Sequence, residues 1–109
     1  EVPCTAVLSD DAISGDYELE TGKLIVEAFD GISFNEVQMG LVANHGAFTW
    51  GETAMKAVYN SVMLEEIART AFLTLQIAPS STPLKISLME KHYNRKHGNH
   101  AYYGHEAKL

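Results

Sequence analysis

The sequence contains little cysteine: Cys4 is the single one among 109 residues. One cysteine can form neither an internal disulfide nor a Cys-x-x-Cys motif, so a disulfide-stapled fold and a cysteine-rich zinc or redox site are excluded within this chain. A lone cysteine near a strand is usually a small hydrophobe, and we expect Cys4 to be buried.

Positive charge is scarce as well. The chain carries 8 Lys and Arg against 14 Asp and Glu, which gives a formal net charge of −6. An acidic chain repels the phosphates of DNA and RNA, and this argues against a nucleic-acid partner. No apolar run approaches the length that spans a bilayer. We therefore expect a cytoplasmic protein with no nucleic-acid or membrane partner.

The composition is that of a small globular domain. Apolar residues make up 46% of the 109 residues and charged residues 20%, which suits one modest core rather than a disordered tail. The chain begins with Glu1 instead of Met, and residues 1–5 have no cap and resemble the middle of a strand. We expect it to be a piece of a longer chain.

Hydrophobic spacing predicts short elements in the first part of the chain. Residues 2–8 are β-branched and apolar enough for a short strand, and residues 10–13 follow a capping serine and suit one helical turn. Residues 23–29 are ambiguous because Ile25-Val26 suits a strand. We predict a helix there, since the apolar positions also share one helical face.

The second half of the chain predicts two helices. Residues 52–78 contain neither Gly nor Pro, and their polar side offers a Glu65–Arg69 pair at i, i+4. After a linker bounded by prolines, a last helix is predicted over residues 84–97, ended by Gly98. Large apolar residues in the long helix are expected to fill the core; they are Met55, Met63 and Phe72.

The stretch over residues 41–51 places one histidine between two apolar runs. This pattern predicts two strands joined by a tight bend, in which Gly46 supplies a positive φ. His45 then lies at the tip of a rigid pair of strands, a suitable place for a metal ligand. One histidine cannot hold a metal, so spacing alone favours a turn residue over a ligand.

The last quarter of the sequence gathers histidine, tyrosine and basic residues. They are His92, Tyr93, Arg95, Lys96, His97, His100, Tyr102, Tyr103 and His105. Three interpretations remain open: a basic helix end that complements the helix dipole, a tail that contacts RNA, or acid–base and anion-binding groups delivered to a site elsewhere. Spacing alone favours the first, because chain ends are often dispensable.

Two runs near the end of the chain carry a more specific pattern. Residues 92–98 (His-Tyr-Asn-Arg-Lys-His-Gly) and 101–104 (Ala-Tyr-Tyr-Gly) resemble the C-terminal signature of the L-ribulose-5-phosphate 4-epimerases, in the class II aldolase/adducin family. The resemblance continues through residues 2–5, 17–22 and 44–51, in order, and covers nearly all of the chain. The turn around the histidine is shared with the aldolases, whereas the ending selects the epimerase branch.

The resemblance implies an α/β fold in which helices pack on an antiparallel sheet, in a three-layer α/β/α arrangement. Residues 1–109 would be the C-terminal half of a single class II aldolase/adducin-like domain. It also implies a cytoplasmic homotetramer, with sites at subunit interfaces and one divalent metal, usually Zn²⁺, per subunit. The implied substrate is a sugar phosphate: the C3–C4 bond of L-ribulose 5-phosphate is cleaved and re-formed to give D-xylulose 5-phosphate.

The resemblance also assigns roles to residues. His45 falls on the family's third histidine ligand, and Tyr103 on a tyrosine that acts as acid or base from a neighbouring subunit. His92, Arg95 and Glu18 match residues near the site. A phenol, with an ordinary pKa of about 10, needs a nearby cation to work as a base at neutral pH, and the metal, Arg95 or His92 could supply it.

Several parts of the family's site have no counterpart in this sequence. The two histidines of the His-x-His metal pair, the aspartate that serves as the opposite acid or base, and the phosphate-binding elements are absent. We expect them upstream, so the piece alone should be inactive. The sequence also has Asn44 before the histidine and five residues after Gly104, two departures from the family pattern. Two alternatives remain: a class II ketose-phosphate aldolase and a non-catalytic adducin-like interaction module.

Overall fold

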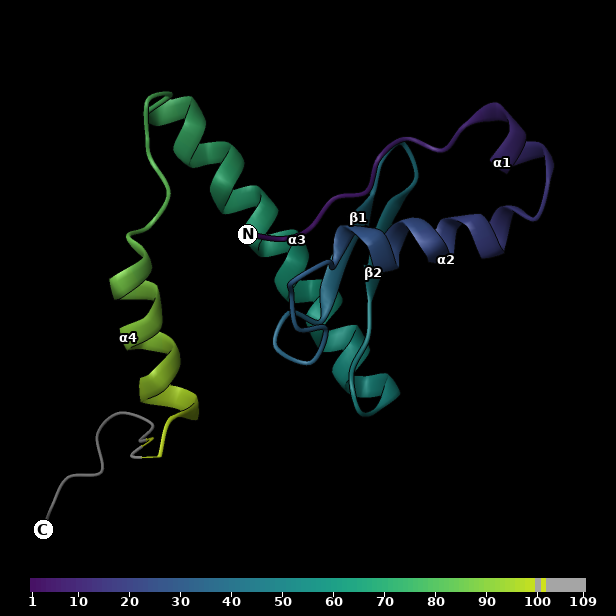
Figure 1. Cartoon of the computed structure of the whole chain (residues 1–109). Coiled ribbons are helices and arrows are strands. Elements are labelled where there is room, and N and C mark those ends of the chain that lie inside the picture. Colours follow the sequence, from purple (N-terminus) through teal and green to yellow (C-terminus); the bar gives the residue numbers. More distant parts are fainter. Residues whose placement is uncertain (100, 102–109) are drawn as a thin grey trace, which may run out of the picture. The chain divides into compact units, whose positions relative to one another are not determined.

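The computed structural model describes residues 1–99 and residue 101. The chain divides into two compact units, Glu1–Leu73 and Thr74–Leu109. Figure 1 labels its elements, which follow in order: α1 (Asp10–Ser14), α2 (Tyr17–Ala28), β1 (Met39–Val42), β2 (Gly46–Thr49), α3 (Ala54–Ile77) and α4 (Ile86–His97).

Strands β1 and β2 form an antiparallel hairpin, as the sequence predicts. Met39 pairs with Thr49 at the open end, and Val42 pairs with Gly46 at the turn. Val42 is one of the most buried of the described residues, with 3% of its surface exposed. Helix α2 contacts β1, and it crosses the hairpin in Figure 1. The predicted α/β class, with helices packed against a small antiparallel sheet, is confirmed.

The N-terminal segment pairs with the other edge of β1. Cys4 forms a single parallel bridge with Leu41, because the Leu41 N–H donates to the Pro3 carbonyl (2.8 Å) and the Thr5 N–H donates to the Leu41 carbonyl (2.9 Å). The prediction of a strand over residues 2–8 is therefore wrong in extent. The prediction that Cys4 is buried is also wrong: Pro3 and Thr5 are buried, and side chains alternate in extended chain, so Cys4 points outward and is exposed.

Helices α1 and α2 start at capping side chains. Ser9 accepts a hydrogen bond from the Ala12 N–H at the start of α1, and Asp16 accepts one from the Leu19 N–H at the start of α2. The helix predicted over residues 23–29 thus begins earlier, because the Asp16 cap starts it and Gly22 is tolerated inside it. A glycine in a helix costs about 1 kcal/mol relative to alanine, which the cap offsets in part.

Helix α3 is the long helix that the sequence predicts. Thr53 caps it, because the Thr53 Oγ1 accepts a hydrogen bond from the Lys56 N–H at 3.1 Å. Its buried residues are Asn60 and Leu64. The prediction that three large residues of this helix fill the core is wrong. The exposed fraction of the surface is 77% for Met55, 37% for Met63 and 63% for Phe72. Apolar residues of this helix are spread around it, and the described residues bury few of them.

One side-chain contact on α3 also differs from prediction. Arg69 approaches Glu66 at 3.8 Å, three residues away, rather than Glu65. Both i+3 and i+4 positions are neighbours of a residue on a helix surface, so the sequence pattern does not distinguish them. Both side chains are exposed, and the pair contributes little to stability.

Helix α4 belongs to the second unit and has no buried residue. It starts two residues later than predicted and ends as predicted, where the Gly98 N–H donates to the Asn94 carbonyl at 2.8 Å. Its apolar residues Ile86, Leu88 and Met89 are exposed rather than packed. Among the described residues, no helix combines the length and the apolar character that crossing a membrane requires.

Candidate functional site

His45 lies at the tip of the β1–β2 hairpin, and its backbone is closely constrained. Its N–H donates to the Val42 carbonyl at 3.0 Å, which closes the turn. The residues on either side have positive φ angles, 59° at Asn44 and 152° at Gly46. Glycine and, to a lesser extent, asparagine tolerate such angles. The predicted role of Gly46 is confirmed, and Asn44 shares the task.

A buried hydroxyl fixes the base of this turn. Thr5 is 7% exposed, and its Oγ1 accepts a hydrogen bond from the Ala43 N–H at 3.1 Å while donating to the Ala6 carbonyl at 2.8 Å. A buried hydroxyl is stable only when it is hydrogen-bonded, so this arrangement selects one position for the chain entering the turn. The N-terminal segment thereby helps to set the place of His45.

The imidazole of His45 is exposed but held by two aromatic neighbours. The hydroxyl of Tyr17, the first residue of α2, shares a hydrogen bond of 2.9 Å with Nδ1. The ring of Phe48 meets the imidazole edge-on, with centroids 5.5 Å apart. Sequence reasoning missed Tyr17 as a neighbour of His45, although it opens the 17–22 run that carries part of the family resemblance.

This geometry suits a metal ligand. Neutral imidazole has one N–H and one lone pair, and metals bind the lone pair. Because Nδ1 shares a hydrogen bond with the Tyr17 hydroxyl, a metal could bind only at Nε2, and only in the tautomer whose proton is on Nδ1. Within the described residues no three His, Cys, Asp or Glu side chains lie together in a way that could hold a metal ion. The described residues therefore do not form a complete metal site by themselves, and the ligand role of His45 remains a prediction.

Glu18 lies in the first turn of α2, directly after Tyr17, and is exposed. Successive side chains on a helix are rotated by about 100°, so Glu18 and Tyr17 point in different directions. The hydrogen bond that reaches the His45 ring comes from Tyr17 and not from Glu18. The near-site role of Glu18 remains a prediction, supported by its place at the end of α2 that reaches His45.

The other predicted site residues belong to the second unit. His92 and Arg95 lie three residues apart on α4, a spacing that puts both on one face, and both are exposed. Basic residues occupy the last turn of this helix, as the dipole interpretation expects. Tyr103 lies outside the described residues. These three roles therefore remain predictions.

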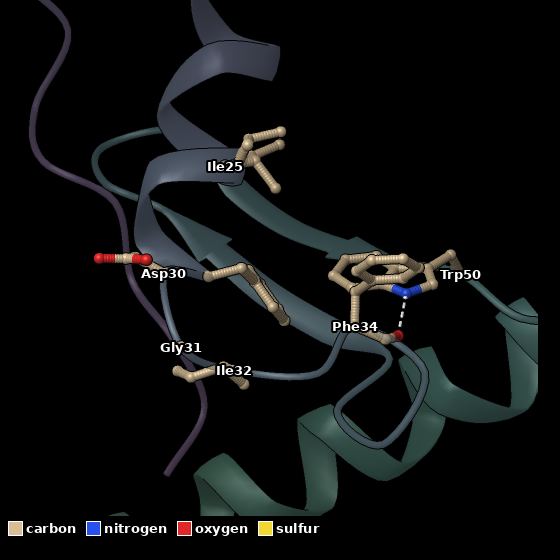
Figure 2. A pocket seen from close by; sticks show the side chains of 8 residues that line it. Ile25, Asp30, Gly31, Ile32, Phe34 and Trp50 are labelled. Atoms are coloured by element: carbon tan, nitrogen blue, oxygen red, sulfur yellow. Dashed lines mark hydrogen bonds between the residues drawn. The ribbon is translucent and has the colours of Figure 1, made fainter.

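A second feature of the first unit is an apolar hollow of about 440 Å³ beside the end of α2 (Figure 2). The Trp50 indole N–H donates to the Phe34 carbonyl at 2.8 Å, and the Phe29 ring meets Trp50 edge-on at 5.2 Å. Among the described residues that line it, Asp30 carries a charge and none is Lys, Arg or His. A carboxylate in an apolar wall repels phosphate, so this hollow does not suit a sugar phosphate.

Comparison with known proteins gives consistent results. A family profile described as the class II aldolase and adducin N-terminal domain matches residues 1–72. L-ribulose-5-phosphate 4-epimerase UlaF from Salmonella paratyphi B (strain ATCC BAA-1250 / SPB7) is 43% identical over 104 residues, which cover 95% of this chain and 46% of that protein. UlaF from Salmonella typhi shows the same identity and coverage. The chain thus spans about half the length of the curated relatives it matches.

Proposed function

The chain belongs to the class II aldolase and adducin family, and from this premise we propose that the intact protein is an L-ribulose-5-phosphate 4-epimerase. The observation that carries the proposal is the 43% identity to such enzymes over 95% of this chain, with the histidine turn and the basic C-terminal run included. The relatives are about twice as long, so the activity is proposed for the intact protein. Residues 1–109 would then form the C-terminal half of its single catalytic domain.

The proposed roles follow from the chemistry of the residues. His45 contributes one nitrogen ligand to a divalent metal, Zn²⁺ by preference, bound once per subunit. When bound, such a metal supplies a Lewis acid that polarises the oxygens of the ketose substrate. Tyr103 holds or removes the proton of the C4 hydroxyl on one face. As that proton leaves, the C4 oxygen becomes an aldehyde oxygen, and the electron pair of the C3–C4 bond moves to the C2 ketone to give an enediolate. The aldehyde fragment then turns over, C3 of the enediolate attacks its other face, and the C4 oxygen takes a proton back, so that the configuration at C4 is inverted.

Two basic residues support Tyr103 in this proposal. Arg95 is a permanent cation, which would favour the phenolate of Tyr103 over the phenol and so make it a usable base. His92 lies on the same face of α4 and would contact the same region of substrate. Glu18, at the start of α2, is proposed as a further polar group near the metal.

The proposed assembly is a cytoplasmic homotetramer in which Tyr103 enters the site of a neighbouring subunit. The exposed apolar surface of α3 and α4 supports burial against other parts of the intact protein, because helices that are apolar on several sides are normally covered. Ile77 is 85% exposed and Ile86 69% in this chain. The sugar-phosphate substrate and the metal are the proposed small partners.

The test uses the intact gene product. Purified protein should contain about one zinc per subunit and interconvert L-ribulose 5-phosphate and D-xylulose 5-phosphate. Tyr103→Phe removes the acid–base hydroxyl and should lower kcat by roughly 10²- to 10⁴-fold, the usual range for a lost general acid or base, with an unchanged unfolding temperature. Tyr102→Phe is the matched control and should keep near wild-type activity.

Each other outcome has a definite meaning. A wild-type rate in Tyr103→Phe would overturn the role of that residue. A zinc protein that instead splits another ketose phosphate to free aldehyde would be a class II aldolase. Wild-type protein without metal and without activity would replace the enzyme proposal by a non-catalytic interaction module.

A further inference from the structure

The contact between Tyr17 and His45 joins two parts of the chain that are far apart in sequence. The hydroxyl oxygen and Nδ1 are 2.9 Å apart across a separation of 28 residues, and the two ring centroids lie 5.8 Å apart with a 39° angle between the planes. This contact is also the hydrogen bond that determines which nitrogen of His45 remains available.

The position of Tyr17 is fixed by its own helix. Its carbonyl accepts a hydrogen bond from the Thr21 hydroxyl at 2.7 Å, and Thr21 is 5% exposed. Asp16 caps the helix immediately before it, and the Tyr17 N–H donates to the Gly15 carbonyl at 3.1 Å. The phenol thus extends from a pinned backbone towards the hairpin, and it is half-buried. Because its own position is fixed, Tyr17 can determine the orientation of the His45 ring.

The hydrogen bond can run in two directions, with different chemical consequences. If the Tyr17 hydroxyl donates to Nδ1, the neutral ring carries its proton on Nε2 and cannot bind a metal there. If Nδ1–H donates to the Tyr17 oxygen, Nε2 presents its lone pair. Ligating histidines in proteins almost always donate their other N–H to an oxygen acceptor, which fixes the tautomer and the ring orientation.

We propose that Tyr17 is a positioning residue for His45: its hydroxyl oxygen accepts the Nδ1–H and so presents Nε2 to the divalent metal. This inference rests on the proposed function and deepens it. Tyr17 itself touches neither metal nor substrate. It acts by fixing the orientation and the tautomer of the His45 ring. The edge-on contact with Phe48 also restricts rotation of that ring.

The first measurement is zinc affinity in the intact protein, by competition with a chelator. Tyr17→Phe removes the acceptor oxygen and keeps the ring, and it should raise the Kd for Zn²⁺ by about 10- to 100-fold, the usual effect of losing such a partner. The matched control is Tyr59→Phe on α3, where the ring lies beneath the Lys56 ammonium at 4.4 Å. It should leave the Kd unchanged.

The second measurement starts with the wild-type protein. In zinc-loaded protein with ¹⁵N-labelled histidine, His45 should be bound through Nε2 and should show an Nδ1–H resonance that exchanges slowly with water. In Tyr17→Phe this exchange should become faster. A zinc bond to Nδ1 in the wild-type protein would overturn the inference, even if the variant failed to fold.

The remaining outcomes separate the two proposals. A wild-type protein that binds zinc and epimerises its substrate, together with a Tyr17→Phe variant of wild-type zinc affinity, would overturn the role of Tyr17 and leave the proposed function intact. A wild-type protein that binds no zinc would overturn the proposed function, and the inference with it.

Discussion

The His45 hairpin and helix α4 both carry candidate site residues, but they differ in how closely the described contacts hold those residues in place. At the hairpin, the turn is held by the buried Thr5 hydroxyl, and the histidine ring by Tyr17 and Phe48. On α4, His92 and Arg95 are exposed residues of a helix without buried residues. The resemblance predicts that the α4 run is the more specific for the epimerase branch, whereas the described contacts constrain the hairpin more closely. A segment with a distinctive sequence is therefore not always the one that the described residues hold in place.

The largest expected difference concerns the two histidines. In the intact protein, His45→Asn should abolish zinc retention and lower epimerisation by about 10³-fold or more, because several kcal/mol of metal stabilisation are lost. His92→Asn should keep its zinc and lose activity by about 10²-fold at most. Metal analysis and steady-state kinetics on both variants check this. Equal zinc loss in the two variants would remove the distinction between the regions.

A smaller difference is expected in stability, between two asparagines. Asn60 is 6% exposed and donates to the Trp50 carbonyl at 2.7 Å and to Gln38 Oε1 at 3.0 Å. Asn60→Ala leaves these acceptors unpaired and should lower the free energy of unfolding by about 1–3 kcal/mol.

The control for Asn60 lies on α4. Asn94 is exposed, and Asn94→Ala should change the free energy of unfolding by no more than about 0.5 kcal/mol. Urea unfolding of both variants of the intact protein measures the two values. A larger loss for Asn94→Ala than for Asn60→Ala would show that α4 is the better-fixed region.

The smallest expected effect is on the surface of α2. Lys23 donates to Glu20 at 2.7 Å, and this hydrogen bond raises the pKa of Lys23 above its ordinary value of 10.5. A raised pKa stabilises the fold below that ordinary value and loses its effect as the pH rises through the folded-state pKa. Glu20→Gln should therefore lower the pKa of Lys23 towards its ordinary value and alter stability only slightly, because both side chains are substantially exposed.

An NMR titration of the Lys23 ammonium measures this shift. Glu66→Gln on α3 is the matched control, since Glu66 approaches Arg69 rather than Lys23. It should leave the titration of Lys23 unchanged. An unchanged pKa of Lys23 in Glu20→Gln would mean that the contact is not maintained in solution.

Local patterns of the sequence predict much of the fold. The Asn-His-Gly turn predicts the hairpin, and the absence of Gly and Pro predicts α3. Burial could not be predicted in the same way: periodicity identifies the apolar face of a helix but not what covers it, so Met55 and Phe72 were assigned to the core and are exposed.

The candidate site was predictable only in part. The turn pattern predicts that His45 lies at the tip of the hairpin, whereas its ligand role comes from the family resemblance and stays a prediction. Its partners were not predicted, because the contacts of Tyr17 with His45 and of Thr5 with Ala43 join residues 28 and 38 positions apart. Local spacing carries no information about such pairs. They depend on α2 and the N-terminal segment both meeting the hairpin.

The parallel pairing of the N-terminal segment with β1 has a consequence for the order of folding during synthesis. The β1–β2 hairpin can close within about 1–10 μs once its residues are available. Thr5 leaves the ribosome first and meets Ala43 only after 38 more residues, which takes roughly 2–8 s at about 5–20 residues per second. For those seconds the segment cannot pair with β1. The turn that carries His45 is therefore completed by Thr5, which is synthesised before the hairpin but pairs with it only after the hairpin has been made.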